Sequence, residues 1–191
     1  MTPHQQAAIE IHQVLTSLDV EYVIIGGTAV QYWGEMRSTQ DVDLTVATPL
    51  DDPEAFVALI LKHFVGRSEN ALAFALKHRV ILVRASNGYS LDISMGLPGY
   101  EEQIIARGVD YEIAPGNWVR VCSAEDLIIH KAVASRPQDI RDIEGVIYRQ
   151  KNHLDATYIR QWLTIFAELL ENPEIPQAFE RPWKQIVNRQ S

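Results

Sequence analysis

The sequence is poor in cysteine and has no long apolar run. Cys122 is the single cysteine among 191 residues, so an intramolecular disulfide is impossible and a reducing, cytoplasmic setting is expected. Cys122 follows an apolar stretch and is predicted to be a buried, unreactive thiol. Residues 1–20 lack the basic start and continuous apolar core of a signal peptide. No apolar run approaches the roughly 20 residues that cross a bilayer, so no membrane partner is expected.

Positive charge is also scarce. The 17 Lys and Arg residues face 25 Asp and Glu residues, which gives a net charge of −8. A surface of this sign does not attract nucleic acid as a whole, so any such contact would need a local basic patch. Hydrophobic residues make up 47% and charged residues 22%, as expected for a globular chain that buries a real core.

Hydrophobic periodicity predicts an α+β fold. A small mixed β-sheet core is expected over residues 1–122, followed by a helical part over residues 123–191. Asp52 and Pro53 predict the start of one helix, and Ser86-Asn87-Gly88 predicts a hairpin turn. The expected strands cover residues 22–25, 41–46, 79–85, 89–94, 109–113 and 118–121. The expected helices cover residues 3–18, 28–34, 53–64, 123–134, 137–150, 155–171 and about 176–189.

Three aspartates carry the chemistry that we predict. Asp41 and Asp43 lie two apart on a predicted strand and therefore share one face, with Val42 between them pointing to the core. Asp92 has apolar neighbours on another predicted strand and is expected to join them. Carboxylates this close repel unless a cation neutralises them, and oxygen-only ligands favour Mg²⁺ or Mn²⁺. Three carboxylates can hold two cations, the arrangement used for in-line phosphoryl displacement.

Gly26 and Gly27 follow the first predicted strand and precede a short helix. Glycine lets the backbone approach a phosphate closely, and a helix N-terminus offers unpaired N–H groups. Thr28 adds a hydroxyl. The pattern predicts a triphosphate-binding turn, although two glycines after a strand are also common in ordinary turns.

Together these motifs resemble the DNA polymerase β-type minimal nucleotidyltransferases. The resemblance rests on Gly26-Gly27-Thr28-Ala29-Val30, Gly34, Arg37, Thr39 and Asp41-Val42-Asp43-Leu44. The later segments 123–131 and 136–143 are similar to the C-terminal block of the AbiEii toxin-like branch. One departure is that Gly27-Thr28 stands where many relatives have Gly-Ser. The resemblance implies a nucleotidyltransferase core whose catalytic and metal-binding residues are Asp41, Asp43 and Asp92. The nucleotide-binding residues that it implies are Gly26, Gly27, Thr28, Arg37, Thr39, Lys131 and Asp139.

Several of these residues also have structural interpretations. Arg37 could form a salt bridge rather than contact phosphates or orient Asp43. Lys131 could extend to solvent from a packed helix, whereas the resemblance places it on nucleotide phosphates. Asp139 could cap its helix or pair with Arg136, and Asp142 is expected to pair with Lys131 or Arg136. The six histidines have no zinc-ligand spacing with cysteine and are expected to serve packing.

The favoured function is transfer of a nucleoside monophosphate (NMP) from a nucleoside triphosphate (NTP) to an acceptor hydroxyl, with Mg²⁺ or Mn²⁺ as cofactor. The acceptor could be tRNA, a protein or a small molecule, and the toxin-like resemblance adds a possible antitoxin partner. A second hypothesis is a catalytically inactive nucleotide-binding or antitoxin-like module, against which all three carboxylates argue. A third is an unrelated α+β metal-binding or phosphate-sensing domain.

Overall fold

The computed structural model describes residues 1–187, whose contacts divide them into two units. The first unit contains residues 1–28 and 38–122, and the second contains residues 29–37 together with the chain from Ser123 onward. The chain passes between the units at residue 122, where the sequence analysis placed the boundary. It also crosses at residues 28 and 37, which the sequence analysis did not anticipate.

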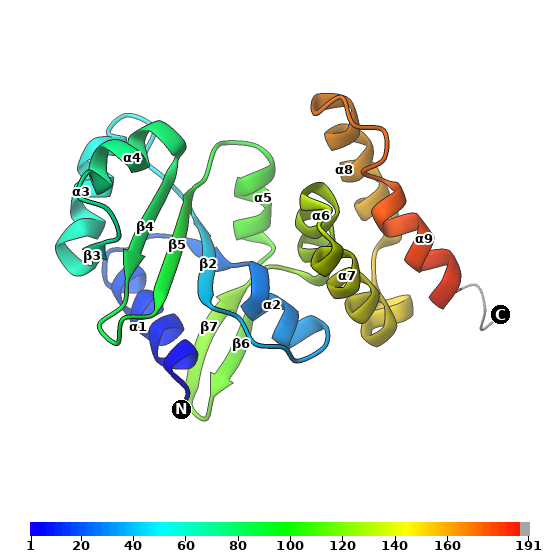
Figure 1. Ribbon diagram of the computed structural model, residues 1–191, viewed down its shortest axis with the longest axis horizontal. Coiled ribbons are helices and arrows are strands. Elements are labelled where there is room, and N and C mark those ends of the chain that lie inside the picture. Colours follow the sequence, from blue (N-terminus) through cyan, green and yellow to red (C-terminus); the bar gives the residue numbers. More distant parts are fainter. Residues whose placement is uncertain (188–191) are drawn as a thin grey trace. The chain divides into compact units, whose positions relative to one another are not determined.

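A mixed sheet forms the first unit (Figure 1). Within the described residues it has seven strands in the order β3-β4-β5-β2-β1-β7-β6. Strand β2 is parallel to β5 and β1 is parallel to β7, whereas the other neighbours are antiparallel. The predicted α+β fold with a mixed sheet is confirmed. The strands are Tyr22–Ile24 (β1), Asp41–Val46 (β2), Val65–Gly66 (β3), Val80–Arg84 (β4), Ser90–Met95 (β5), Val109–Ala114 (β6) and Asn117–Val121 (β7).

Alternation explains the central strands. In β2, Val42 and Leu44 are fully buried while the intervening aspartates are half-exposed, and in β5 Leu91 and Ile93 are fully buried in the same way. This period of two aims the apolar set at the core and leaves the polar set on the opposite face. The β4–β5 hairpin turns at Gly88, whose φ of +82° suits glycine.

Helices accompany this sheet. They are α1 (Pro3–Ser17), α3 (Pro53–His63), α4 (Ala71–His78) and α5 (Tyr100–Ala106), and α2 (Gly26–Trp33) begins in the same unit. Asp52 caps α3 as predicted, because its side chain accepts a hydrogen bond from the Ala55 N–H. The sequence analysis missed β3, α4 and α5. It also began the second helix at Thr28, whereas the two glycines are the first residues of α2.

The second unit is helical. Its elements are α6 (Ala124–Ala134), α7 (Pro137–Gln150), a 3₁₀ turn η1 (Lys151–His153), α8 (Ala156–Leu169) and α9 (Gln177–Ile186). All four predicted helices occur; residues 188 and 189 of the last one lie outside the described part. Segment 29–37 belongs here because Arg149 donates to the Gly34 carbonyl at 2.5 Å and Gln150 to the Trp33 carbonyl at 3.0 Å. The core of this unit includes Leu127, Ile128, Ile143, Ile147, Ile159, Leu163 and Phe179.

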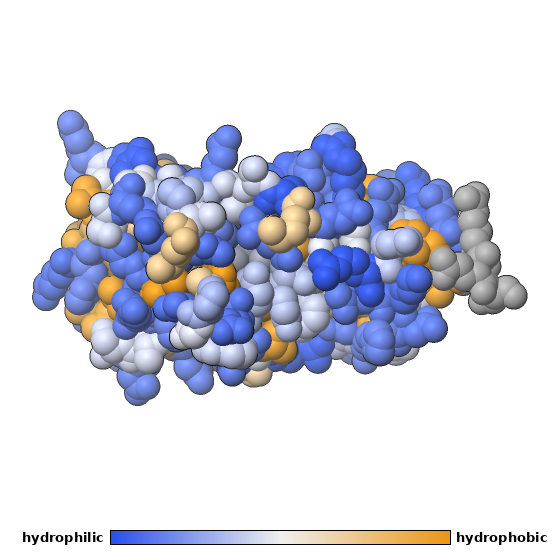
Figure 2. Space-filling view, turned by 90° about the horizontal axis from the view of Figure 1, so that it is seen from below, coloured by the Kyte–Doolittle hydropathy of each residue, from blue (hydrophilic) through white to orange (hydrophobic). Residues whose placement is uncertain are grey.

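The surface is largely hydrophilic on the face seen in Figure 2, where the apolar areas are small and separate. Cys122 is fully buried, as predicted. None of the helices formed by residues 1–187 combines the length and the apolar character that crossing a bilayer requires.

Candidate active site

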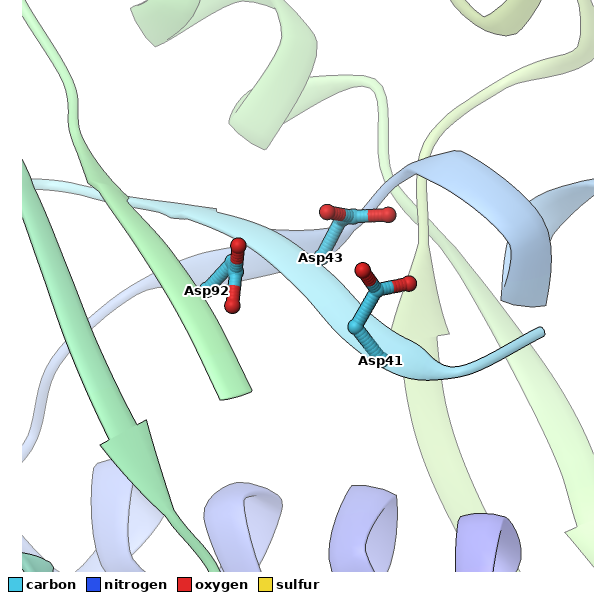
Figure 3. A group of neighbouring side chains, drawn as sticks. All are labelled: Asp41, Asp43 and Asp92. Carbon is cyan, nitrogen blue, oxygen red and sulfur yellow. The ribbon is translucent and has the colours of Figure 1, made fainter. Parts of the chain in front are cut away.

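An acidic cluster lies on one face of the sheet in the first unit (Figure 3). Asp41 and Asp43 project from β2, and Asp92 projects from β5 directly beside Asp43 in the parallel register. One oxygen from each of the three carboxylates lies within 4.8 Å of the others, and all three residues are half-buried. The structure therefore brings together the three aspartates that the spacing singled out.

Arg67 is a cluster residue that the sequence analysis missed. Its Nη2 lies 2.5 Å from Asp92 Oδ1, and the two side chains are 23% and 29% exposed. Burial raises the pKa of Asp92, the Arg67 charge and hydrogen bond lower it, and the charge of Asp41 raises it; the net direction is upward. No local motif marks Arg67, because its position depends on the pairing of β3 with β4.

The glycine turn lies against the same cluster. Gly26 has a φ of +60°, and a Cβ there would lie 2.0 Å from Asp43 Oδ2. A Cβ on Gly27 would lie 2.5 Å from Thr39 Oγ1. Both positions therefore exclude a side chain, for reasons of space and at Gly26 also of backbone conformation. The first turn of α2 thus starts in van der Waals proximity to the triad.

Thr39 joins the turn to the cluster. Its hydroxyl lies 3.1 Å from the Asp41 carbonyl and 3.2 Å from Asp41 Oδ1, with geometry for donation to either oxygen. The Tyr89 hydroxyl donates to the Thr39 carbonyl. Burial raises the pKa of Tyr89, and the charge of Asp41 raises it further. Thr39 is therefore held from both sides beside Asp41.

Thr28 is fully buried, and its hydroxyl lies 2.8 Å from His4 Nε2. Burial lowers the pKa of His4, although the charge of Asp41 opposes the change. The hydroxyl that was expected to face a phosphate thus has a partner within the protein, and its contact with nucleotide stays a prediction. His4, assigned to packing, fixes the third residue of α2.

The remaining predicted nucleotide ligands lie in a buried ionic cluster of the second unit. Lys131 Nζ contacts Asp139 at 3.0 Å and Asp142 at 2.9 Å. Arg37 donates to both oxygens of Asp142 at 2.9 Å, and Arg136 Nε donates to Asp139 at 2.7 Å. The salt-bridge interpretation of Arg37 and the pairing expected for Asp142 are confirmed. Lys131 does not extend to solvent, since its side chain is 8% exposed.

Electrostatics in this cluster favour the charged state. Burial alone would raise the pKa of Asp139, but hydrogen bonds from Arg136 and Lys131 lower it overall. Burial likewise opposes the lowered pKa of Asp142, which Arg37, Lys131 and Gln138 bring about. That Arg37, Lys131 and Asp139 also contact nucleotide stays a prediction.

Comparison with known families gives a match over almost the whole chain. A family model described as a nucleotidyltransferase of unknown function (DUF6036) matches residues 5–190. No curated protein matches the sequence.

Similar folds occur among solved structures. An antigenic nucleotidyltransferase-like protein from Paracoccidioides brasiliensis has a TM-score of 0.56 and 22% identity, with 92% of this chain and 91% of that chain covered. The solution structure of antibiotic-resistance factor ANT(2″)-Ia has a TM-score of 0.55 and 20% identity, covering 88% and 93%. The same factor in complex with adenylyl-2″-tobramycin has a TM-score of 0.51 and 20% identity, covering 84% and 95%. At these identities the likeness shows a common fold.

Proposed function

This chain belongs to the family of nucleotidyltransferases of unknown function (DUF6036), and we propose that it transfers an NMP from an NTP to an acceptor hydroxyl. The observation that carries the proposal is the convergence of Asp41, Asp43 and Asp92 beside a glycine turn that admits no side chain. An inactive descendant would have no need to keep three mutually repelling carboxylates in one place.

A divalent cation fits the acidic cluster. The three carboxylates offer oxygen donors within 4.8 Å of one another, and Mg²⁺ and Mn²⁺ prefer such hard, anionic ligands. Asp41, Asp43 and Asp92 would hold the cation, and the two-metal arrangement is part of the proposal. When bound, a cation here would neutralise phosphate charge and ease ionisation of the acceptor hydroxyl.

The glycine turn would hold the triphosphate. Gly26 and Gly27 carry no side chain that would keep a phosphate from the backbone, and the first N–H groups of a helix such as α2 have no partner within the helix. In the transfer, the acceptor oxygen bonds to the α-phosphorus while the bond to the pyrophosphate oxygen breaks. The hydroxyl proton passes to a carboxylate of the triad. Thr28, Arg37, Thr39, Lys131 and Asp139 complete the proposed nucleotide contacts.

The acceptor remains a choice among tRNA, a protein side chain and a small molecule. The complex of ANT(2″)-Ia with an adenylylated tobramycin supports a small-molecule acceptor for that fold neighbour. The net charge of −8 disfavours a large RNA held by general electrostatic attraction. Membership of the toxin-like branch, with an antitoxin partner, is part of the proposal and rests on segments 123–131 and 136–143.

Incubation with each α-labelled NTP, Mg²⁺ or Mn²⁺ and cell extract tests the proposal. Label should appear on RNA, protein or a small molecule, and Asp41→Asn should abolish it. Asp110→Asn is the matched control, because this carboxylate is 70% exposed on β6. Nucleotide binding without transfer in every extract would instead favour the inactive binding module. Slower cell growth with the wild type but not with Asp41→Asn would support the toxin role.

A further inference from the structure

Backbone pairing within the sheet places Arg67 in the same row as Asp92. Its backbone N–H donates to the Leu82 carbonyl at 2.9 Å, Leu82 pairs with Asp92, and Asp92 pairs with Asp43. These four residues thus form one row that runs from the end of β3 across the middle of β4, β5 and β2. The Arg67 side chain must pass over β4 to reach Asp92, a span that suits the length of arginine.

The backbone before Arg67 is equally fixed. Gly66 pairs with Val83, and a Cβ at Gly66 would lie 2.6 Å from the Cβ of Ala71 in α4. The chain therefore makes a tight passage from β3 towards α4, directly before Arg67. The geometry places its guanidinium at the acidic cluster.

The bonding of the guanidinium is unbalanced. Nη2 donates to Asp92 Oδ1 at 2.5 Å, whereas the buried Nε has no hydrogen-bond partner among the described residues. A buried donor without an acceptor destabilises the fold. Packing alone gives no reason to accept this cost, but attraction to three clustered carboxylates does.

We propose that Arg67 is a positioning residue that acts as a built-in counter-charge for the acidic cluster. While no cation is bound, it holds Asp92 beside Asp41 and Asp43 and offsets part of their repulsion. An incoming cation must share Asp92 with Arg67, so Arg67 also limits how tightly the cluster binds a cation. This inference rests on the proposed function, because it takes the triad to be the cation site.

Arg67→Met tests the inference through binding and stability, independently of activity. Without nucleotide, the Mn²⁺ dissociation constant should fall about tenfold, since one repelling positive charge is removed within about 5 Å. The melting temperature in chelator should fall by about 3 °C and return with saturating Mn²⁺. Arg67→Lys keeps the charge and should stay close to the wild type in both measurements.

Lys77→Met is the matched control, because Lys77 is an exposed cation on α4; it should leave Mn²⁺ affinity unchanged. In an Asp92→Asn background the effect of Arg67→Met on Mn²⁺ affinity should shrink, because the shared ligand is gone. An unchanged Mn²⁺ affinity in Arg67→Met, with equal loss of melting temperature with and without Mn²⁺, would overturn the inference alone. A wild type that binds no Mn²⁺ would overturn the cation site of the proposed function and this inference with it.

Discussion

Two groups of aspartates in this chain differ in their exposure, in the charges around them and in the direction of their pKa shifts. Asp92 in the first unit has a raised pKa and lies half-exposed among other carboxylates. Asp139 and Asp142 in the second unit are 1% and 4% exposed, contact Lys131, and have lowered pKa values. A raised pKa means that the charged carboxylate is held at a cost, whereas a lowered pKa means that its charge is stabilised. Under the proposed function, the first group serves chemistry at the expense of stability, whereas the charges of the second group stabilise the fold.

The largest effect should come from Asp43→Asn. Loss of a carboxylate from the triad should lower transfer activity by at least about 100-fold. Replacing only a hydrogen-bond partner of a metal ligand already lowers metal affinity or activity by about 10- to 100-fold. The melting temperature should not fall, since one source of repulsion is removed. Asp142→Asn is the paired change in the other group and should lower the melting temperature. Equal destabilisation by both variants would erase the contrast.

Lys131→Met should have the next largest effect. It leaves Asp139 and Asp142 buried without their shared cation, so the free energy of unfolding should drop by about 3 kcal/mol in denaturant titration. Lys77→Met removes an exposed charge and should change it by less than about 0.5 kcal/mol. A higher KM for NTP in the folded Lys131→Met protein would support the nucleotide role. Unchanged kinetics would leave Lys131 with its structural role alone.

Gly27→Ala should weaken NTP binding by the first unit without changing any charge. The new Cβ would meet Thr39 Oγ1 at 2.5 Å, which must shift the turn and is expected to lower NTP affinity about tenfold, or about 1.4 kcal/mol. Gly145→Ala in α7 is the control, since its Cβ would meet the flexible Glu35 side chain at 3.3 Å. Nucleotide affinity that is unchanged in Gly27→Ala, measured by fluorescence titration, would remove the turn from the site.

The smallest effect should be in the pH dependence of stability. The pKa values of Asp139 and Asp142 are depressed in the folded protein. Their contribution to the free energy of unfolding is therefore complete above about pH 3.8 and is lost as the pH falls through their folded-state pKa values. The pKa of Asp92 is raised, so acidification through its folded value should add stability. Urea titrations from pH 3 to 7 should show that the free energy of unfolding falls less on acidification in Asp142→Asn than in the wild type. In Asp92→Asn the increase on acidification should be absent. Slopes identical to the wild type in both variants would contradict the assignment.

The sequence alone was enough to predict those features of the fold that depend on a local pattern of residues. Alternation at Asp41–Val46 gives both the strand and the shared face of its aspartates, and Asp52-Pro53 gives the start of α3. Arg67 could not be found in this way, because it reaches Asp92 only through the two-residue strand β3. Short elements such as α4 and α5 carry too few turns for a clear period. The assignment of segment 29–37 to the helical unit depends on contacts more than 100 residues apart.

The three crossings between the units make the helical unit discontinuous. A fragment that ended at Cys122 would still contain Trp33, Gly34 and Arg37, but it would lack Gln150, Arg149 and Asp142, which bind them. These three residues, which would lose their partners, lie in the sequence between the glycine turn and the strand of Asp41. A cut at residue 122 therefore divides the helical unit itself, because segment 29–37 stays with the first fragment. Neither unit should accordingly be stable when it is produced alone from a chain divided at residue 122.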